Sequence, residues 1–235
     1  MAAAAPGCGS ALPCSEREIG ETSDRSCLNA HVLASRYTSD VRPAPAEIDG
    51  VLSTYSSSLR ALSDLCFVRA KMWWSEVHRV EFDVTEPAVA NAWAQGELST
   101  GISQLDSVLD AAGAKEVAPV AGTSGAYLVI FRHAVNAENL EREIGVLPGV
   151  DPRVERYTYD EGEEILLEEP VPGTTDVVFR YGWGDCNVQC DGNHWWRIRV
   201  TTDGGSELIE EWGAPIPDAE VPRMQSRVMN ECTSS

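Results

Sequence analysis

Hydrophobic side chains recur every three to four positions between residues 47 and 72, from Ile48 to Phe67, directly after the proline-rich stretch 43–45. This spacing predicts an amphipathic helix that begins after the prolines. Residues 1–46 show no such repeat and are rich in alanine, serine, proline and charged residues. We therefore expect residues 1–46 to form a mostly irregular tether segment, pinned by its three cysteines.

Strand-like alternation and helical spacing then follow one another over residues 77–159. Their order is strand, helix, strand, strand, helix, strand, with one helix ending at Gly113 and the other beginning at Asn136. The ferredoxin-like split βαβ fold has this order, with helices covering a four-stranded antiparallel sheet. The strands are expected at residues 77–84, 115–121, 126–132 and 150–159.

This segment resembles the propeptide-inhibitor domains of subtilisin-like proteases. The resemblance rests on Tyr127-Leu128-Val129-Ile130-Phe131 and on residues 140–154, where a short helix, Leu147-Pro148-Gly149-Val150 and a strand follow in that family's order. It covers about a third of the chain. It implies a ferredoxin-like fold and the role of a protease inhibitor or propeptide-like protein.

The pattern changes again after an acidic stretch, residues 160–169, which is expected to be a linker. Three strands are predicted at 177–181, 195–201 and 206–211, the last two joined by a turn at Asp203-Gly204-Gly205. The chain is therefore predicted to be α+β: a helix, a ferredoxin-like βαββαβ domain and a small antiparallel β module with a C-terminal strap. The expected units are 1–46, 47–160 and 161–235.

The cysteines indicate the compartment. Seven of them are scattered along the chain, which favours disulfides over a zinc knuckle and hence an exported protein, secreted or in the periplasm or cell envelope. Met1 is followed by four alanines without a basic region, so we expect that a signal peptide was removed and Met1 added. Ala5-Pro6-Gly7-Cys8 is similar to a lipoprotein cleavage site, which predicts a lipid anchor at Cys8 and leaves six cysteines to pair.

The net charge and the hydropathy of the chain limit the classes of partner that we expect it to bind. The chain carries 37 acidic and 18 basic residues, a net charge of −19. Such a surface repels nucleic acid and anionic lipid headgroups. The sequence contains no run of about 20 apolar residues that a membrane-spanning helix needs. An extracellular or envelope protein or a glycan remains as the expected partner.

Residues 181–196 form the segment richest in candidate chemistry. They are similar to a Gly-x-Gly-Asp-Cys-x3-Cys-x3-His-Trp segment of uncharacterised secreted bacterial proteins, a resemblance that implies no activity. We predict a Cys186–Cys190 disulfide that closes a loop between adjacent strands. The alternative is a metal-binding or enzymatic use of Asp185, Cys186, Cys190 and His194. A fourth zinc ligand and the closing carboxylate of a calcium loop are not evident, and CxxxC does not match a thiol-redox site.

Tryptophans flank this disulfide. Alternation along a strand places Trp195 and Trp196 on opposite faces, so at least one of them should face solvent or another domain. An exposed tryptophan in an exported protein indicates contact with a carbohydrate or a protein, whereas the alternative is packing at a domain joint. The predicted ligand-binding residues are Trp183, His194, Trp195 and Trp196.

Known catalytic patterns are missing from the sequence: there is no G-x-S-x-G, P-loop, H-E-x-x-H or G-x-G-x-x-G. No catalytic residue, metal or cofactor is predicted. The sequence therefore favours a non-enzymatic binding or interaction protein.

Overall fold

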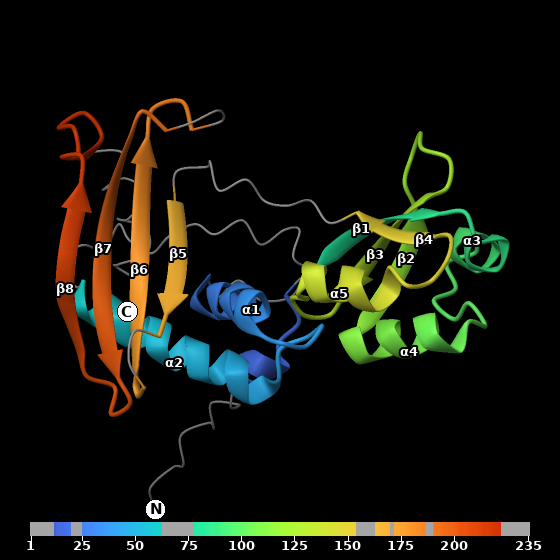
Figure 1. The fold of residues 1–235 in the computed structure, drawn as a ribbon, viewed down its shortest axis with the longest axis horizontal. Helices are drawn as coiled ribbons and strands as arrows, with labels where there is room; N and C mark the ends of the chain where they lie inside the picture. The colour runs from blue at the N-terminus through green and yellow to red at the C-terminus, as the bar shows by residue number, and fades with distance from the viewer. Residues whose placement is uncertain are drawn as a thin grey trace, which may run out of the picture.

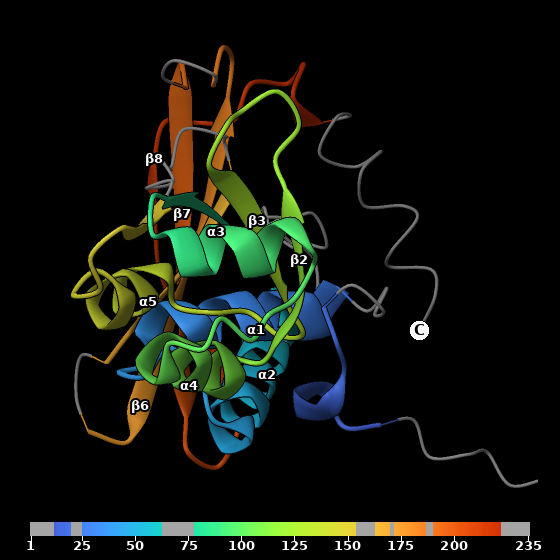
Figure 2. The same cartoon turned by 90° about the vertical axis from the view of Figure 1, so that its right-hand side faces the viewer.

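The structure is a computed structural model that describes residues 12–19, 25–62, 78–153, 163–169, 172–186 and 190–221. These residues form five α-helices and two four-stranded antiparallel sheets, which confirms the α+β class (Figure 1). The two sheets lie at opposite ends of the long axis, and the first two helices lie between and beneath them (Figures 1 and 2).

The segment expected to be irregular contains a helix, α1 (Arg25–Tyr37), preceded by the short 3-10 helix η1 (Cys14–Glu16). That expectation is therefore wrong for residues 25–37. Helix α1 is buried on nearly every side because it lies between the two sheets, and its buried residues include the polar Asn29 and His31. Polar as well as apolar side chains occupy its buried positions, in a segment rich in alanine, serine and charged residues, so the helix is hard to recognise from the sequence.

Helix α2 (Pro45–Ala61) confirms the predicted amphipathic helix, and the predicted residues 63–72 lie outside the described residues. Its first turn has a proline at the start, and the Glu47 carboxylate accepts a hydrogen bond from the backbone N–H of Ala44. Both features favour a helix beginning here.

The first sheet has the strand order β2-β3-β1-β4, with every pair antiparallel. Helix α4 ends at Gly113, whose φ of 78° is left-handed, and the Asn136 side chain caps α5, both as predicted. The part of the last predicted strand beyond residue 153 lies outside the described residues. The elements are β1 (Arg79–Val84), α3 (Pro87–Ala94), α4 (Ser103–Ala112), β2 (Ala114–Pro119), β3 (Ala126–Phe131), α5 (Ala137–Ile144) and β4 (Val150–Arg153).

Helix α3 was not predicted, because Pro87 was interpreted only as the end of a strand. Pro87 is the first residue of the helix, where a missing N–H costs nothing, and the Glu86 carboxylate accepts from the N–H of Ala88. Trp93 on α3 is fully buried and meets Phe82 and Tyr127 edge-on, so this helix closes the core of the first sheet.

The second sheet is an antiparallel meander of β5 (Glu163–Glu168), β6 (Thr174–Trp183), β7 (Gly192–Thr201) and β8 (Ser206–Gly213). Three of these strands and the turn at residues 203–205 confirm the prediction. Strand β5 corrects it, since residues 163–168 belong to the sheet and not to a linker. Residues 163–168 pair with β6 along their whole length, and Ile165 is completely buried opposite Phe179. The apolar run Ile165-Leu166-Leu167 is short and lies between glutamates, so the segment resembled an acidic linker in the sequence.

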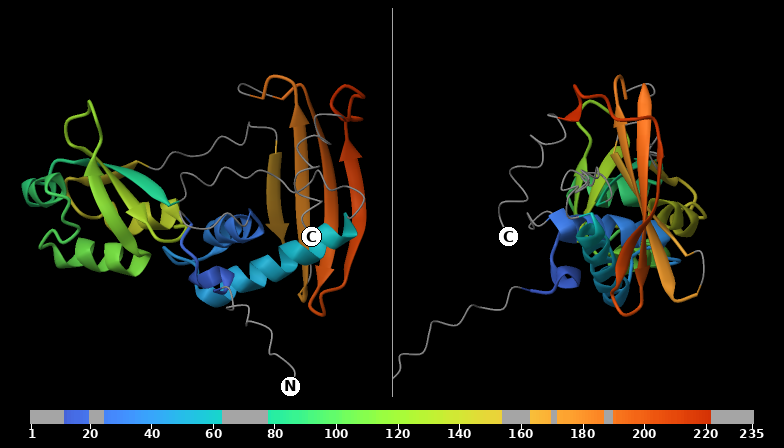
Figure 3. Two further views of the ribbon diagram at one scale, coloured as in Figure 1. Left: turned by 180° about the vertical axis from the view of Figure 1, so that it is seen from behind. Right: turned by 90° about the vertical axis from the view of Figure 1, so that its left-hand side faces the viewer.

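Helix α2 packs against the second sheet, although its place in the chain suggested the first (Figure 3). Tyr55 on α2 is buried with Phe179 on β6, their ring centroids 6.2 Å apart, and Trp196 on β7 completes the same cluster. The apolar stripe of α2 thus belongs to a core whose other half lies more than a hundred residues later.

Helix α1 connects this core to the first sheet. The Asn139 amide of α5 donates to the carbonyls of Thr38 and Asp40, at 3.2 and 2.8 Å. Glu18 forms ion pairs with Lys115 and Arg132, and the N–H of Ile19 donates to the Arg132 carbonyl at 3.0 Å. Residues 18, 19, 38 and 40 therefore join this part of the chain to the first sheet through specific polar contacts.

Candidate binding face of the second sheet

Strand β7 separates its side chains cleanly between the two faces of the second sheet. His194, Trp196 and the next two alternate residues are buried beneath α2, while Trp195 and Arg197 lie half-buried on the opposite face. This period of two is what a strand with one covered face requires. The predicted separation of Trp195 from Trp196 is observed.

Two of the predicted ligand-binding tryptophans serve packing. Trp196 is 1% exposed in the core of the second sheet. Trp183 is half-buried, stacks on Tyr181 with centroids 6.1 Å apart and covers Gly192. A Cβ at Gly192 would lie 2.4 Å from the Trp183 ring, so glycine is the residue that allows this approach. These contacts place both indoles on the covered side of the sheet.

His194 is also held in place by neighbouring groups. Its Nδ1 lies 2.9 Å from the Ala214 carbonyl and its Nε2 lies 2.8 Å from the Glu211 carboxylate. The ring rests against Trp196 at a centroid distance of 4.6 Å. With both nitrogens engaged, the imidazole anchors the segment that follows β8 and presents no unpaired nitrogen to a ligand.

The opposite face carries a different arrangement. Trp195 and Trp212 are direct cross-strand partners on β7 and β8, and their rings are parallel within 3° at a centroid distance of 5.9 Å. The Arg180 guanidinium lies 5.5 Å from the Trp195 ring and that of Arg197 lies 5.3 Å from the Trp212 ring. Cation–π attraction and stacking hold all four side chains. We call these residues, Arg180, Trp195, Arg197 and Trp212, the tryptophan–arginine face.

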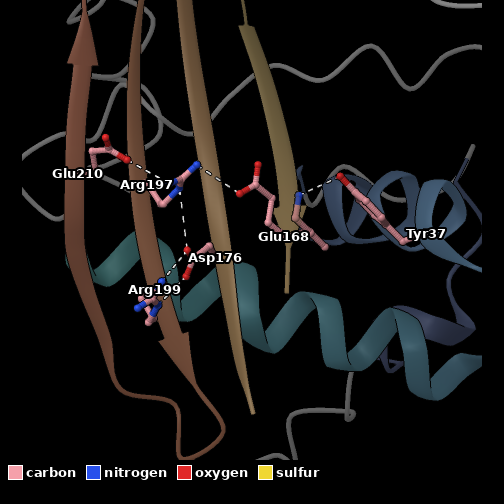
Figure 4. Close-up of polar contacts among 7 residues, drawn as sticks. Tyr37, Glu168, Asp176, Arg197, Arg199 and Glu210 are labelled. Carbon is pink, nitrogen blue, oxygen red and sulfur yellow. Dashed lines mark hydrogen bonds and ion pairs between the residues drawn. The ribbon is translucent and has the colours of Figure 1, made fainter. Parts of the chain in front are cut away.

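An ionic network fixes the arginine beside Trp212 (Figure 4). Arg197 reaches the carboxylates of Glu168 at 3.3 Å and Glu210 at 3.0 Å, on either side of it in the sheet. Asp176 is 1% exposed and accepts two hydrogen bonds from Arg199, at 2.8 and 3.0 Å, which raise the pKa of the Arg199 guanidinium. Such charge-assisted pairs restrict side-chain motion.

Charges of both signs are interleaved on this face. Three arginines, at positions 180, 197 and 199, share it with the carboxylates of Glu168, Asp176, Glu207 and Glu210, of which Glu207 is the cross-strand partner of Arg199. The surface that remains for a ligand is therefore aromatic and near neutral. It suits a sugar ring or an uncharged peptide segment better than a strongly anionic ligand.

Of this face, the sequence prediction named Trp195 and missed Arg180, Arg197 and Trp212. The register that starts at the turn, with Val200 opposite Ser206 and Ile198 opposite Leu208, would by itself place Glu211 opposite Trp195. One register irregularity between Arg197 and Ile198 shifts this pairing by a residue, which the sequence pattern does not reveal.

The predicted Cys186–Cys190 disulfide is confirmed, with a Cα–Cα distance of 4.0 Å. It closes the connection between β6 and β7 next to the tryptophan–arginine face, and the Arg180 guanidinium lies 3.8 Å from the Cys190 sulfur. Because the two sulfurs are bonded to each other, neither thiol is available as a metal ligand or a nucleophile in this state. Asp185 beside them is exposed.

A second disulfide joins Cys14 to Cys27. In the described part of the chain, these two cysteines and His31 are the residues close enough together to hold a metal ion. Cys8, the predicted lipid-anchor residue, lies outside the described residues, as do Cys66 and Cys232.

Comparisons with protein families, with curated proteins and with solved structures found no match for this chain. Across the residues that the structure describes, no helix has the length and apolar character needed to cross a membrane. The geometry of the chain's own residues therefore carries the functional argument.

Proposed function

We propose that this chain is an exported binding protein that engages an extracellular or envelope glycan or protein through the tryptophan–arginine face. The observation that carries the proposal is the parallel pair of half-buried tryptophans, Trp195 and Trp212, on the face of the sheet opposite α2. Indole rings held at fixed orientation lose little conformational freedom on binding and offer a large apolar surface. The two disulfides support export to an oxidising compartment.

The position of this face argues against its being a joint between the two sheets. The first sheet meets the second through α1 and the polar contacts of residues 18, 19, 38 and 40, whereas α2 covers the other face of the second sheet (Figure 1). Trp196, which does pack internally, is the tryptophan that serves the joint with α2. Trp195 and Trp212 therefore have no packing role toward the first sheet among the described contacts.

Replacement of both Trp195 and Trp212 by alanine is expected to weaken binding of the ligand by at least about 30-fold, the effect of losing one central aromatic anchor worth about 2 kcal/mol. An array of envelope polysaccharides, soluble glycans and envelope proteins identifies the ligand, and calorimetry measures the affinity. Binding should change little with salt, because the face is near neutral.

The matched control is the pair Leu208→Ala and Ile209→Ala, which removes exposed apolar side chains from the same strand (42% and 40% exposed). The control variant should bind like the wild type. Equal binding by the tryptophan double variant, or no binding by the wild type to any extracellular material, would contradict the proposal.

A second function rests on the first sheet. Its strand order β2-β3-β1-β4, all antiparallel, with α4 and α5 in contact, supports the ferredoxin-like topology and with it the resemblance to subtilisin-type propeptides. Under this proposal the full chain inhibits a subtilisin-type protease at micromolar concentration. A steady-state assay with a chromogenic peptide substrate measures the effect, and unchanged hydrolysis would refute it.

A further inference from the structure

Cys14, Cys27 and His31 form a compact buried group at the start of α1. Cys27 and His31 are one helical turn apart and share one face of the helix, and η1 places Cys14 beside them. The exposed fractions of the three residues are 6%, 0% and 0%, and their potential ligand atoms all lie within 4.8 Å of one another. Two sulfurs and an imidazole at such spacing are the donor set that zinc prefers.

The hydrogen bonding of His31 fits a metal ligand. Its Nε2 lies 2.9 Å from the Cys14 carbonyl, which can only accept, so Nε2 carries the proton of the neutral ring. The Nδ1 lone pair is then buried, without a partner in the described part of the chain. Ligating histidines typically donate their second ring N–H to a backbone carbonyl in this way, whereas a buried nitrogen without a partner is destabilising.

A second histidine adjoins the group. His133 is 6% exposed, and its ring stacks on His31 at a centroid distance of 5.6 Å and an interplanar angle of 19°. Its Nδ1 is likewise buried and unpaired within the described residues. Two imidazoles, each with a buried Nδ1 that has no hydrogen-bond partner among the described residues, thus lie together beside the Cys14–Cys27 disulfide. The disulfide at 186–190 offers no such surroundings, because both nitrogens of His194 are engaged.

We propose that Cys14, Cys27 and His31 form a redox-controlled site that binds a zinc-type divalent cation when the Cys14–Cys27 disulfide is reduced. A phosphine reductant breaks the S–S bond by giving it two electrons, takes up the oxygen of water as phosphine oxide, and leaves two thiols that carry the water protons. The cation then displaces both thiol protons and forms two metal–sulfur bonds. Metal–sulfur bonds of about 2.3 Å in a tetrahedron place the sulfurs about 3.7 Å apart. His133 lies beside this site, stacked on His31.

Titration of the full chain with cobalt(II) tests this site, since tetrahedral cobalt thiolates absorb in the near ultraviolet and the visible. After reduction with a water-soluble phosphine, we expect one equivalent of cobalt to give the thiolate-to-cobalt band, and zinc to displace it. The oxidised chain should show no band. Cys27→Ser and His31→Gln should each weaken binding by at least the roughly 100-fold that loss of a supporting group can cause.

The double variant Cys186→Ser with Cys190→Ser is the matched control and should bind cobalt like the wild type. His31→Gln keeps a donor for the Cys14 carbonyl, and circular dichroism of the oxidised variant checks that it folds. No band in the reduced wild type, or a band that survives both Cys27→Ser and His31→Gln, overturns the proposal. The proposal does not rest on the tryptophan–arginine face, whose ligand is tested with oxidised protein.

Discussion

Replacement of Trp196 by alanine is expected to lower the free energy of unfolding by about 3–5 kcal/mol, the usual cost of emptying a buried aromatic site. The indole is 1% exposed and lies among Phe179, Ile198 and Tyr55, so the neighbours can fill the cavity only in part. The loss also removes the contact between His194 and the indole ring, at a centroid distance of 4.6 Å. Urea denaturation followed by far-ultraviolet circular dichroism measures the difference.

The same substitution at Trp195, one residue earlier, is the control. Trp195 is half-buried and contacts Trp212 and Arg180 at the surface, so its removal is expected to cost about 1 kcal/mol. The two variants thereby separate the core role of one tryptophan from the binding role proposed for the other. Equal urea midpoints for Trp195→Ala and Trp196→Ala would contradict the assignment of faces.

Acidification of the oxidised protein from pH 6.5 to pH 4 is expected to cost about 3 kcal/mol of stability through His133 alone. Burial, the Arg42 charge and the neighbouring His31 lower the pKa of His133 from 6.5 to about 4. Below pH 6.5, His133 therefore binds a proton in the unfolded chain but remains neutral in the folded chain, and this difference favours unfolding. The loss approaches its full value below pH 4, where His133 is protonated in the folded chain as well, and each unit of pKa difference corresponds to about 1.4 kcal/mol. Burial lowers the pKa of His31 as well, which adds to the effect.

His133→Gln isolates this contribution, because the carboxylates of the chain titrate in both proteins. Urea midpoints measured at intervals between pH 7 and pH 4 should fall less steeply in the variant. Arg42→Gln should also flatten the curve, since it removes a positive charge that opposes protonation of both histidines. Parallel curves for the wild type and His133→Gln would show that this histidine titrates normally.

The elements that the sequence predicted correctly are those whose local signals agree with their surroundings. Helix α4 has its stop at Gly113 and α5 its cap at Asn136, and both lie on one side of a sheet, so their apolar residues form stripes. Strands β6 and β7 are long and apolar enough to be evident without their partners.

Two of the elements that the prediction missed, α1 and β5, depend on contacts distant in the chain. Asn29 is a polar residue buried in α1, where its amide donates to the Tyr55 hydroxyl at 3.0 Å. Strand β5 is acidic at both ends and becomes a strand because β6 supplies its hydrogen bonds. In each case tertiary structure overrides the local pattern.

The candidate site, too, was predicted only in part from the sequence. Alternation alone separates Trp195 from Trp196, but it does not say which of the two faces α2. That choice is set by α2, a helix far away in the chain, which covers the side that carries Trp196. The importance of Trp212 follows only from the hairpin register, and that of His31 and His133 only from a contact between residues about a hundred positions apart.

The packing of α2 on the second sheet also determines when the molecule can complete its fold. Tyr37 caps the free edge of β5 through the N–H of Leu167, 130 residues later, and Arg60 reaches the carbonyl of Gly204, 144 residues later. During synthesis the N-terminal helices therefore emerge long before the strands that cover their apolar sides. Contacts between residues so far apart in the sequence form slowly, and until they form the incomplete chain exposes hydrophobic surface. The first sheet, whose pairs are local to residues 79–153, can form in the meantime, and the two N-terminal helices complete their packing last.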